Sequence, residues 1–283
     1  MNAPRTIDFP PCSRIFLGDS EIASIPVDDR GFAYGDGLFE TMRSAGHHLP
    51  WWPRHWDRLS RDAARLGIAL PEESRMLDTA LALLRDHTAV VRLQVTRGPG
   101  PRGYSPGSPR PSLWVVSVSD APAPKPRIDV RWCTTRLGLQ PALAGIKHCN
   151  RLEQVLARAE WTQADSGIDE GLMLDADGHV VCATAANVFI LRDDAWLTPR
   201  IDRCGVRGVC RDWLLDAVDA REARLSPADV EGADAVVLCN AVRGILEVAR
   251  LGDRAWSPHP GVTRQRERLA AAHPAFAIPM EFP

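Results

Sequence analysis

The sequence predicts a two-domain α/β protein of the α+β type, with a smaller N-terminal α/β domain and a larger, strand-rich C-terminal α/β domain. Its 283 residues are enough to build two hydrophobic cores of ordinary size. Three prolines alternate with other residues between Asp120 and Pro126, a pattern that disfavours both a helix and an interior strand. We therefore predict domains at residues 1–119 and 127–283, joined by an extended linker at 120–126.

The N-terminal part is expected to combine short strands with two helices. Alternation of apolar and polar residues favours a strand, whereas apolar residues three to four positions apart favour a helix. The predicted strands are 14–17, 38–43, 89–96 and 113–118, and the predicted helices are 54–66 and 72–86. This mixture is typical of an α+β domain.

The C-terminal part is expected to be richer in strands. The predicted strands are 128–134, 171–174, 180–191 and 235–239, and the predicted helices are 150–163 and 212–220. The turn 175–178 ends in Gly178, because glycine readily adopts the positive φ that a hairpin requires. The proline-rich end from Trp256 onward is expected to be a loosely packed tail.

Composition favours a soluble protein that acts on a small molecule. The formal net charge is -2, so no global basic field suggests a nucleic-acid partner. Seven cysteines form no CxxC pair, and this odd number favours reduced thiols. The segment from Met1 to Asp8 lacks the apolar core of a secretion signal, and no segment has the length needed to cross a membrane. We expect a cytoplasmic protein without a metal site, in which Asp36 between two glycines has a structural role.

The segment from Gly145 to Gln154 is the most informative one, because it contains Lys147 at the end of an apolar run. A helix is predicted to follow, and His148 and Arg151 lie nearby. Partial desolvation and neighbouring cations favour the neutral amine, which is the form that attacks a carbonyl carbon. On this segment alone, an ordinary surface lysine is the alternative.

Four segments in the same order resemble the class IV aminotransferase family, whose members depend on pyridoxal phosphate, and in particular its aminodeoxychorismate lyase branch. They are 29–41, 55–59, 97–104 and 145–154. The resemblance implies fold type IV and a homodimer whose sites lie near the subunit interface. It also implies the conversion of 4-amino-4-deoxychorismate to 4-aminobenzoate and pyruvate.

The same resemblance assigns roles to individual residues. It implies that Lys147 bonds covalently with pyridoxal phosphate and acts as acid and base, and that Arg58 donates to the phosphate. Turns at Val206–Arg207 and Asn240–Ala241 are expected to add backbone N–H donors. Family aminotransferases usually carry threonine in place of Arg207. A solvated arginine is the alternative for Arg58, because positions 54, 58, 61 and 65 form one stripe on the predicted helix.

The main departure from the family is Cys182. Relatives carry a glutamate there, and that carboxylate keeps the pyridine nitrogen of the cofactor protonated, whereas a neutral thiol is a weak partner. The same segment contains Asn187, another expected cofactor contact. A reaction that ends in an aromatic ring draws part of its driving force from the substrate, which would allow the thiol. The alternative is a cofactor-binding protein with lost or changed activity.

The residues expected to bind substrate are Arg151, Arg102 and Tyr104. Family aminotransferases tend to carry tyrosine in place of Arg151, whereas the lyases carry arginine. Arg102 and Tyr104 lie in a loop rich in glycine and proline, for which a flexible surface loop is the alternative. Two rival functions stay open: an aminotransferase for D- or branched-chain amino acids, and a non-catalytic binding protein that retained the fold.

Overall fold

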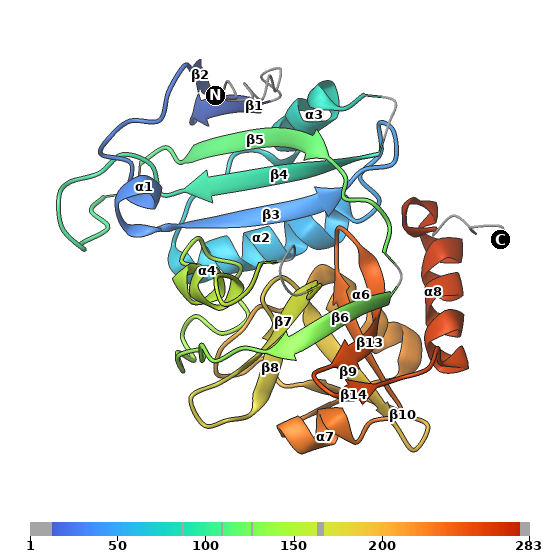
Figure 1. Cartoon of the computed structure of the whole chain (residues 1–283). Helices are drawn as coiled ribbons and strands as arrows, with labels where there is room; N and C mark the ends of the chain where they lie inside the picture. The colour runs from blue at the N-terminus through green and yellow to red at the C-terminus, as the bar shows by residue number, and fades with distance from the viewer. Residues whose placement is uncertain (1–12, 86–87, 109, 126, 163–166, 278–283) are drawn as a thin grey trace, which may run out of the picture.

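The strands of the protein form two sheets, one before and one after the segment 121–125. The computed structural model describes residues 13–85, 88–108, 110–125, 127–162 and 167–277. Figure 1 shows the N-terminal sheet in the upper half, the C-terminal sheet in the lower half, and helix α2 between them. The mixed α/β architecture expected from the sequence is thus confirmed.

The N-terminal sheet is antiparallel throughout, with strand order β2-β1-β5-β4-β3. Its strands are β1 (Ser13–Leu17), β2 (Ser20–Ile22), β3 (Gly37–Arg43), β4 (Ala89–Thr96) and β5 (Leu113–Asp120). Its helices are α1 (Arg30–Tyr34), α2 (Trp52–Leu66) and α3 (Glu73–Leu83). The core between this sheet and the helices includes Leu38, Leu59, Met76, Leu93 and Trp114, all almost fully buried. Strand β3 is one edge of the sheet.

The C-terminal sheet is mixed, with strand order β11-β10-β9-β12-β13-β6-β7-β8 and β14 paired to β13. Its strands are β6 (Arg127–Trp132), β7 (Glu170–Leu174), β8 (Val180–Ala183), β9 (Asn187–Arg192), β10 (Ala195–Pro199), β11 (Arg221–Ala223), β12 (Ala235–Asn240), β13 (Gly244–Leu251) and β14 (Arg254–Ala255). Its helices are α4 (Leu152–Arg158), α6 (Val209–Val218), α7 (Pro227–Glu231), α8 (Pro260–Ala272) and the short 3-10 helix η1 (Pro274–Phe276).

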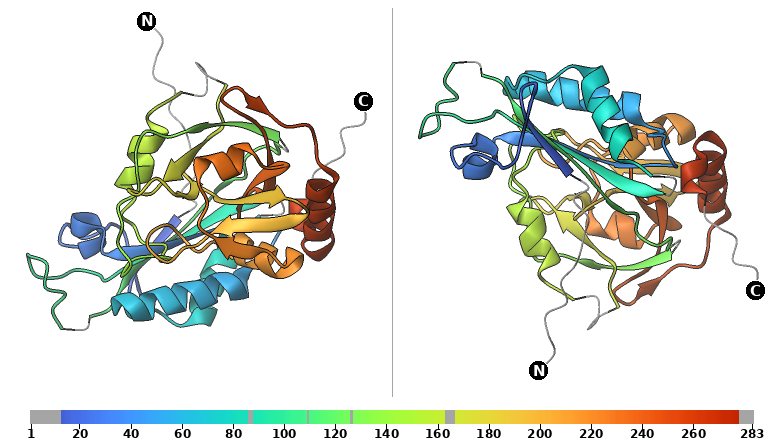
Figure 2. Two further views of the ribbon diagram at one scale, coloured as in Figure 1. Left: turned by 90° about the horizontal axis from the view of Figure 1, so that it is seen from below. Right: turned by 90° about the horizontal axis from the view of Figure 1, so that it is seen from above.

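Helix α8 shows that the expectation of a loose tail after Trp256 was wrong up to residue 277; residues 278–283 lie outside the described residues. Trp256, Val262, Leu269 and Phe276 are all buried against the C-terminal sheet. The prolines mark helix starts instead of preventing helices: Pro260 occupies the first turn of α8, where its missing N–H removes no hydrogen bond. Figure 2 shows α8 at the opposite end of the molecule from α1.

Three further elements differ from their predicted extents. The strand predicted at 180–191 is divided, because β8 pairs with β7 whereas β9 pairs with β10 and β12. The helix predicted at 150–163 is shorter, spanning Leu152–Arg158, and residue 163 lies outside the described residues. The helix predicted at 72–86 is also shorter, because α3 ends at Leu83. Residue 86 lies outside the described residues. The strands β2, β10, β11, β13 and β14 and the helices α1 and α7 were not predicted.

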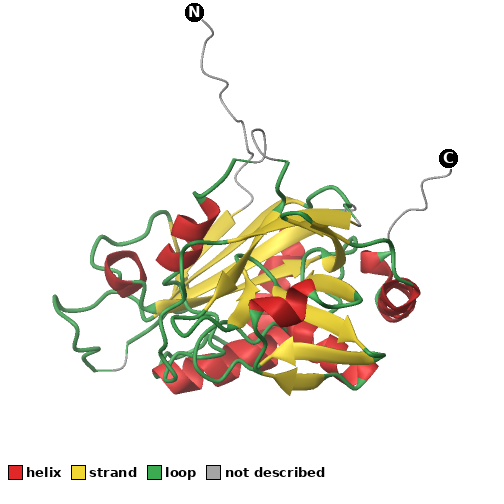
Figure 3. Cartoon of the chain, turned by 60° about the horizontal axis from the view of Figure 1, so that its bottom comes forward, coloured by secondary structure: helices red, strands yellow, loops and turns green. Residues whose placement is uncertain are grey.

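The loop between β4 and β5 projects from the body of the molecule on the same side as α1 (Figure 3). Among the described helices, none combines the length and the apolar character that a membrane span needs.

Candidate active site

Lys147 lies on an extended segment that pairs with both the N-terminal and the C-terminal half of the chain. On one side His148 forms an antiparallel bridge with Leu38 of β3, and on the other Gly145 forms a parallel bridge with Val206, which lies just before α6. The main chain around the lysine is therefore held by both halves at once.

The side-chain amine of Lys147 is in an unusual setting. Its Nζ lies 4.3 Å from the centre of the Phe39 ring, and Cζ of Arg92 lies 4.2 Å from the same ring centre. Burial and the nearby charge of Arg58 lower the pKa of Lys147 to about 7, and Arg151 and Arg92 act in the same direction. A large fraction of this amine is therefore neutral near neutral pH.

The chain contains only one other lysine, Lys125. Its Nζ lies 2.5 Å from Oδ1 of Asp169, and its side chain is about half exposed. The amine of Lys125 is thus paired with a carboxylate, so of the two lysines Lys147 is the one whose buried setting favours nucleophilic attack.

Arg58 is buried in a charged cluster with Glu40 and His55. Nε of Arg58 donates to Oε1 of Glu40 at 2.8 Å, Nη2 donates to Oε2, and Nδ1 of His55 lies 2.6 Å from Oε2. Burial opposes ionisation of Glu40, but the charges of Arg58 and His55 outweigh it and lower its pKa to about 2. The alternative of a solvated arginine is therefore wrong for Arg58, which is 5% exposed.

The turn before α6 is suited to an anion. Nη1 of Arg58 donates to the carbonyl of Arg207 at 2.9 Å, which ties the guanidinium to this turn. The N-cap of α6 is Gly208, and no side chain of the described residues caps the amides of the first turn. Free amides and the positive end of the helix dipole attract phosphate. Arg58 and the start of α6 together form a candidate phosphate site.

Asn187 holds this turn in place. Its Nδ2 donates to the carbonyl of Val206 at 2.9 Å. A Cβ at position 208 would come within 2.2 Å of Oδ1 of Asn187, so a larger residue there would displace this side chain. In the neighbouring strand, Oδ1 of Asn240 accepts the amides of Val242 and Arg243 at 3.0 and 2.8 Å.

The two expected phosphate turns differ in which amides remain available. The amide of Arg207 donates to the carbonyl of Gly145 at 3.1 Å, and the Arg207 side chain forms ion pairs with Asp212 and Glu222. Within the described residues, the amides of Val206 and Ala241 donate to no protein acceptor. Val206 and Ala241 are thus the better backbone donors.

Cys182 lies on β8 in a buried apolar cluster that includes Met173 and Trp161. Burial raises the pKa of this thiol to about 12, and the guanidinium of Arg151 only partly opposes the effect. Cys182 is therefore a neutral thiol at physiological pH. It cannot provide a carboxylate at this position.

Arg151 folds back onto the segment that carries Lys147. Its Nε donates to the carbonyl of His148 at 2.8 Å and its Nη2 to that of Ile146 at 3.3 Å. Its charge lowers the pKa values of both Lys147 and Cys182. Arg151 therefore belongs to the same site as these two residues.

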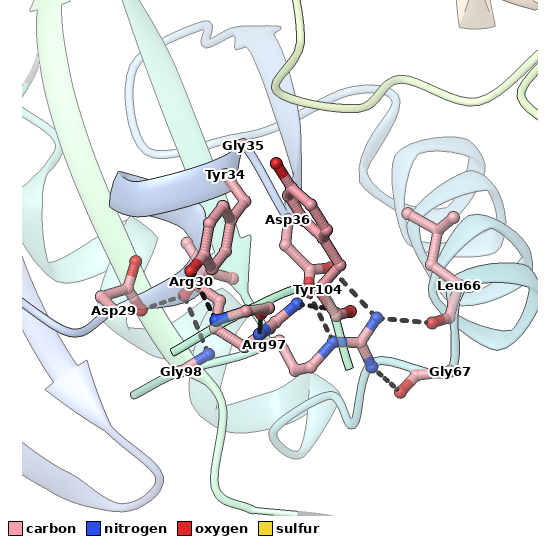
Figure 4. A network of polar contacts seen from close by, with 12 residues as sticks. Asp29, Arg30, Tyr34, Gly35, Asp36, Leu66, Gly67, Arg97, Gly98 and Tyr104 are labelled. Carbon is pink, nitrogen blue, oxygen red and sulfur yellow. Dashed lines mark hydrogen bonds and ion pairs between the residues drawn. The ribbon is translucent and has the colours of Figure 1, made fainter. Parts of the chain in front are cut away.

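Arg30 and Arg97 fix the base of the projecting loop that carries Arg102 and Tyr104 (Figure 4). Both donate to Asp36, which confirms its structural role but through two arginines instead of its own turn. Arg30 also donates to the carbonyls of residues 103 and 104 at 2.9 and 3.2 Å.

The structure does not bring Arg102 and Tyr104 to Lys147 within one chain. Arg102 is exposed, and Tyr104 is 89% exposed with its ring packed edge-on against Tyr34. Their side chains are presented outward.

Three residues of the site were missed from the sequence: Glu40, Asp62 and Arg92. Glu40 lies between Leu38 and Met42 on the buried face of β3, and a charged residue in a buried register position was a readable signal. Asp62 shares a face of α2 with Arg58 and accepts the amide of Lys147. Arg92 carried no local signal, because its nearness to Lys147 depends on the tertiary fold.

Comparisons with known proteins agree with this geometry. The family model described as amino-transferase class IV matches residues 37–251. An aminodeoxychorismate lyase from Vibrio harveyi is 34% identical over 236 residues, which cover 80% of this chain and 86% of that protein. The crystal structure of 4-amino-4-deoxychorismate lyase from Pseudomonas aeruginosa has a TM-score of 0.83 at 37% identity and covers 92% of this chain and 98% of its own. The branched-chain amino acid aminotransferase of Escherichia coli shares the fold, with a TM-score of 0.81 at 18% identity over 95% of this chain and 97% of its own. The expected fold type IV architecture is confirmed.

Proposed function

The chain belongs to the class IV aminotransferase family, and we propose that it is a pyridoxal-phosphate-dependent lyase that converts 4-amino-4-deoxychorismate to 4-aminobenzoate and pyruvate. The observation that carries the proposal is Lys147, one of two lysines, which lies where the two halves of the chain meet and has a pKa of about 7. Lyases are among the relatives with more than 30% identity. Arg151 also favours a lyase, because family aminotransferases tend to carry tyrosine there.

Pyridoxal phosphate fits the donor set of this site. Lys147 offers the amine for covalent attachment, and Arg58, the amide of Val206 and the uncapped start of α6 offer donors for a phosphate dianion. We propose that Asn187 and Asn240 hold the two phosphate turns in place. The amide of Ala241 is a second backbone donor to the phosphate. Bound pyridoxal phosphate supplies an aldehyde that condenses with amines and a conjugated ring that withdraws electrons from the bond being broken.

Nζ of Lys147 carries out the proton transfers. Its neutral form, abundant because the pKa is about 7, removes the proton from the substrate ring carbon. The resulting ammonium returns a proton to the departing enolpyruvyl group, which leaves as pyruvate. Because this loss completes an aromatic ring, the product itself favours the elimination.

Arg151 and Arg92 are our candidates for binding a substrate carboxylate next to Lys147. Arg92 makes a hydrogen bond with Gln94 at 3.1 Å, and among the described residues no carboxylate pairs with it. A guanidinium without a carboxylate partner gains a strong, charge-assisted bond when an anionic ligand arrives.

We further propose that the protein acts as a homodimer through the side that carries α1, α4 and the projecting loop. Large apolar side chains on this side are exposed, including Phe32 at 75%, Tyr104 at 89% and Leu152 at 76%. Exposed apolar groups in this number are typical of an interaction surface. In such a dimer the outward-facing Arg102 and Tyr104 would reach the site of the second protomer.

Leu156→Lys is expected to yield monomers and to lower product formation in parallel, because Leu156 is 60% exposed on α4 and a lysine there cannot be buried without cost. Sedimentation at several protein concentrations measures the assembly. Thr263→Lys, at an exposed position of α8, adds the same charge and should change neither property. A monomeric Leu156→Lys with full activity would contradict the dimer proposal.

The aminotransferase alternative predicts a different half-reaction. Incubation with D-alanine or leucine should leave the visible absorbance unchanged if the protein is a lyase, whereas an aminotransferase accumulates the pyridoxamine form. A non-catalytic binding protein would give neither this change nor 4-aminobenzoate.

We expect the reaction to supply the aromatic unit of folate in the cytoplasm, where the six described cysteines, all free, stay reduced.

Cys182→Glu is expected to leave the lyase rate within about threefold of wild type, because aromatisation reduces the need for a protonated pyridine nitrogen. Initial rates of 4-aminobenzoate formation measure the effect, and Cys204→Ser is a control in the same apolar cluster. A rise of about a hundredfold would show that the missing carboxylate limits the reaction.

A further inference from the structure

Asp62 is a buried carboxylate that contacts the main chain of Lys147. Its side chain lies on α2 and is 2% exposed, and its Oδ2 accepts the amide N–H of Lys147 at 3.0 Å. Its second oxygen, Oδ1, is buried and makes no hydrogen bond in the described part of the chain; Nε of Arg61 lies 3.6 Å away as an ion pair.

This arrangement needs an explanation, because a buried carboxylate with one unsatisfied oxygen is unfavourable for stability alone. The neighbouring buried positions Leu59 and Ala63 on the same helix are apolar. Burial raises the pKa of Asp62, whereas the bond from the Lys147 amide lowers it. Within the part of the chain that the structure describes, the one hydrogen bond of this side chain is thus made to the segment that carries the reactive lysine.

The charges around Lys147 and Asp62 come from four elements of the fold. Those that act on Lys147 are Arg58 from α2, Glu40 from β3, Arg92 from β4 and Arg151 from the segment before α4. Those that act on Asp62 are Arg61, Arg58 and Glu40. The charges of Lys147 and Glu40 also act on His55 of α2. Three arginines and one carboxylate, Glu40, are therefore the largest charges that act on the amine.

We propose that Asp62 is a positioning residue for the reactive amine: it holds the main chain of Lys147 through the amide and supplies a negative charge that moderates the surrounding arginines. The bond fixes where the lysine side chain begins, and the charge limits how far the arginines favour the neutral amine. Only the effect on turnover rests on the proposed function; the contact and the charge balance do not.

The pH at which the Lys147 amine titrates tests the charge. The full-length protein, freed of cofactor, is labelled with a trace of acetic anhydride from about pH 5 to pH 10, and acetylation of each lysine is read by peptide mass spectrometry. In Asp62→Asn the midpoint for Lys147 should fall by about half a pH unit or more, because loss of a negative charge disfavours the ammonium. Lys125, the only other lysine, is an internal standard that should not shift.

Comparison of Asp62→Asn with Asp62→Ala separates the charge of Asp62 from its hydrogen bond. Asp62→Asn keeps an oxygen that accepts the Lys147 amide, so its kcat should stay within about threefold of wild type, whereas Asp62→Ala loses the acceptor and should lower kcat about tenfold with a smaller change in KM. Asp57→Asn makes the same charge change at an exposed position of α2 and should leave both measurements unchanged.

An unshifted Lys147 midpoint in Asp62→Asn would overturn the charge role, and an unchanged kcat in Asp62→Ala would overturn the holding role. If Asp62→Ala fails to fold, so that Lys125 also shifts, Asp62→Asn decides alone. A wild-type protein that forms no 4-aminobenzoate, but whose Lys147 midpoint still falls in Asp62→Asn, would refute the proposed function and support the role of Asp62.

Discussion

Replacing Lys147 with alanine should lower 4-aminobenzoate formation by about a thousandfold or more, because one amine serves as cofactor anchor, base and acid. No other residue can take over, since Lys125 is ion-paired to Asp169 outside the site. Borohydride reduction of the wild-type holoenzyme should fix the cofactor to the peptide containing Lys147, and the variant should show no fixed cofactor by mass spectrometry.

Lys125→Ala is the matched control, because it removes the other lysine of the chain. It should keep both the rate and the fixed cofactor. An adduct on Lys125 in either protein would mean that the site has been assigned to the wrong amine.

Arg58→Ala should be the second most damaging change, with a loss of stability of about 3 to 5 kcal/mol and a large loss of cofactor affinity. The substitution leaves Glu40 buried without its guanidinium partner and frees the turn at Arg207. Urea unfolding measures the stability, and cofactor titration measures the affinity. Arg54→Ala on the exposed side of the same helix removes only a solvent-exposed ion pair and should change neither much.

The stability loss should depend on pH in a defined direction. The pKa of Glu40 is lowered from 4.5 to about 2, so its pairing stabilises the fold above the unfolded-state value and is lost as the pH falls towards 2. Wild type and Arg58→Ala should therefore converge in acid.

A double variant separates stability from cofactor binding. Glu40→Gln combined with Arg58→Met removes both charges and should recover much of the stability without restoring the cofactor affinity. If Arg58→Ala alone bound the cofactor as tightly as wild type, Arg58 would have no part in the phosphate site.

Local motifs were sufficient to identify Lys147 and Arg58 as candidate site residues, but not the residues that surround them. Both lie in short segments whose spacing is visible in the sequence, whereas Glu40 gains its role only when β3 packs against α2. Asp62 on α2 and Arg92 on β4 approach Lys147 from two different elements, so no pattern within either element identifies them. The exposure of each arginine on α2 likewise depends on what the helix packs against.

The fold was predictable where one element has one partner and less so where strands change partners. The strand predicted at 180–191 is one apolar run in the sequence, but its two halves pair with different neighbours, and the turn between them carries little signal. Helix α8 was obscured by flanking prolines, although Val262 and Leu269 are spaced by seven residues on one buried face. The predicted domain limits stay a prediction.

The most direct test of the central claim is the stoichiometry of products from enzymatically generated 4-amino-4-deoxychorismate. We expect wild-type protein loaded with pyridoxal phosphate to release 4-aminobenzoate and pyruvate in equal amounts, and Lys147→Ala to release neither. Loaded wild-type protein that leaves the substrate intact, or Lys147→Ala that turns it over at the wild-type rate, would contradict the account.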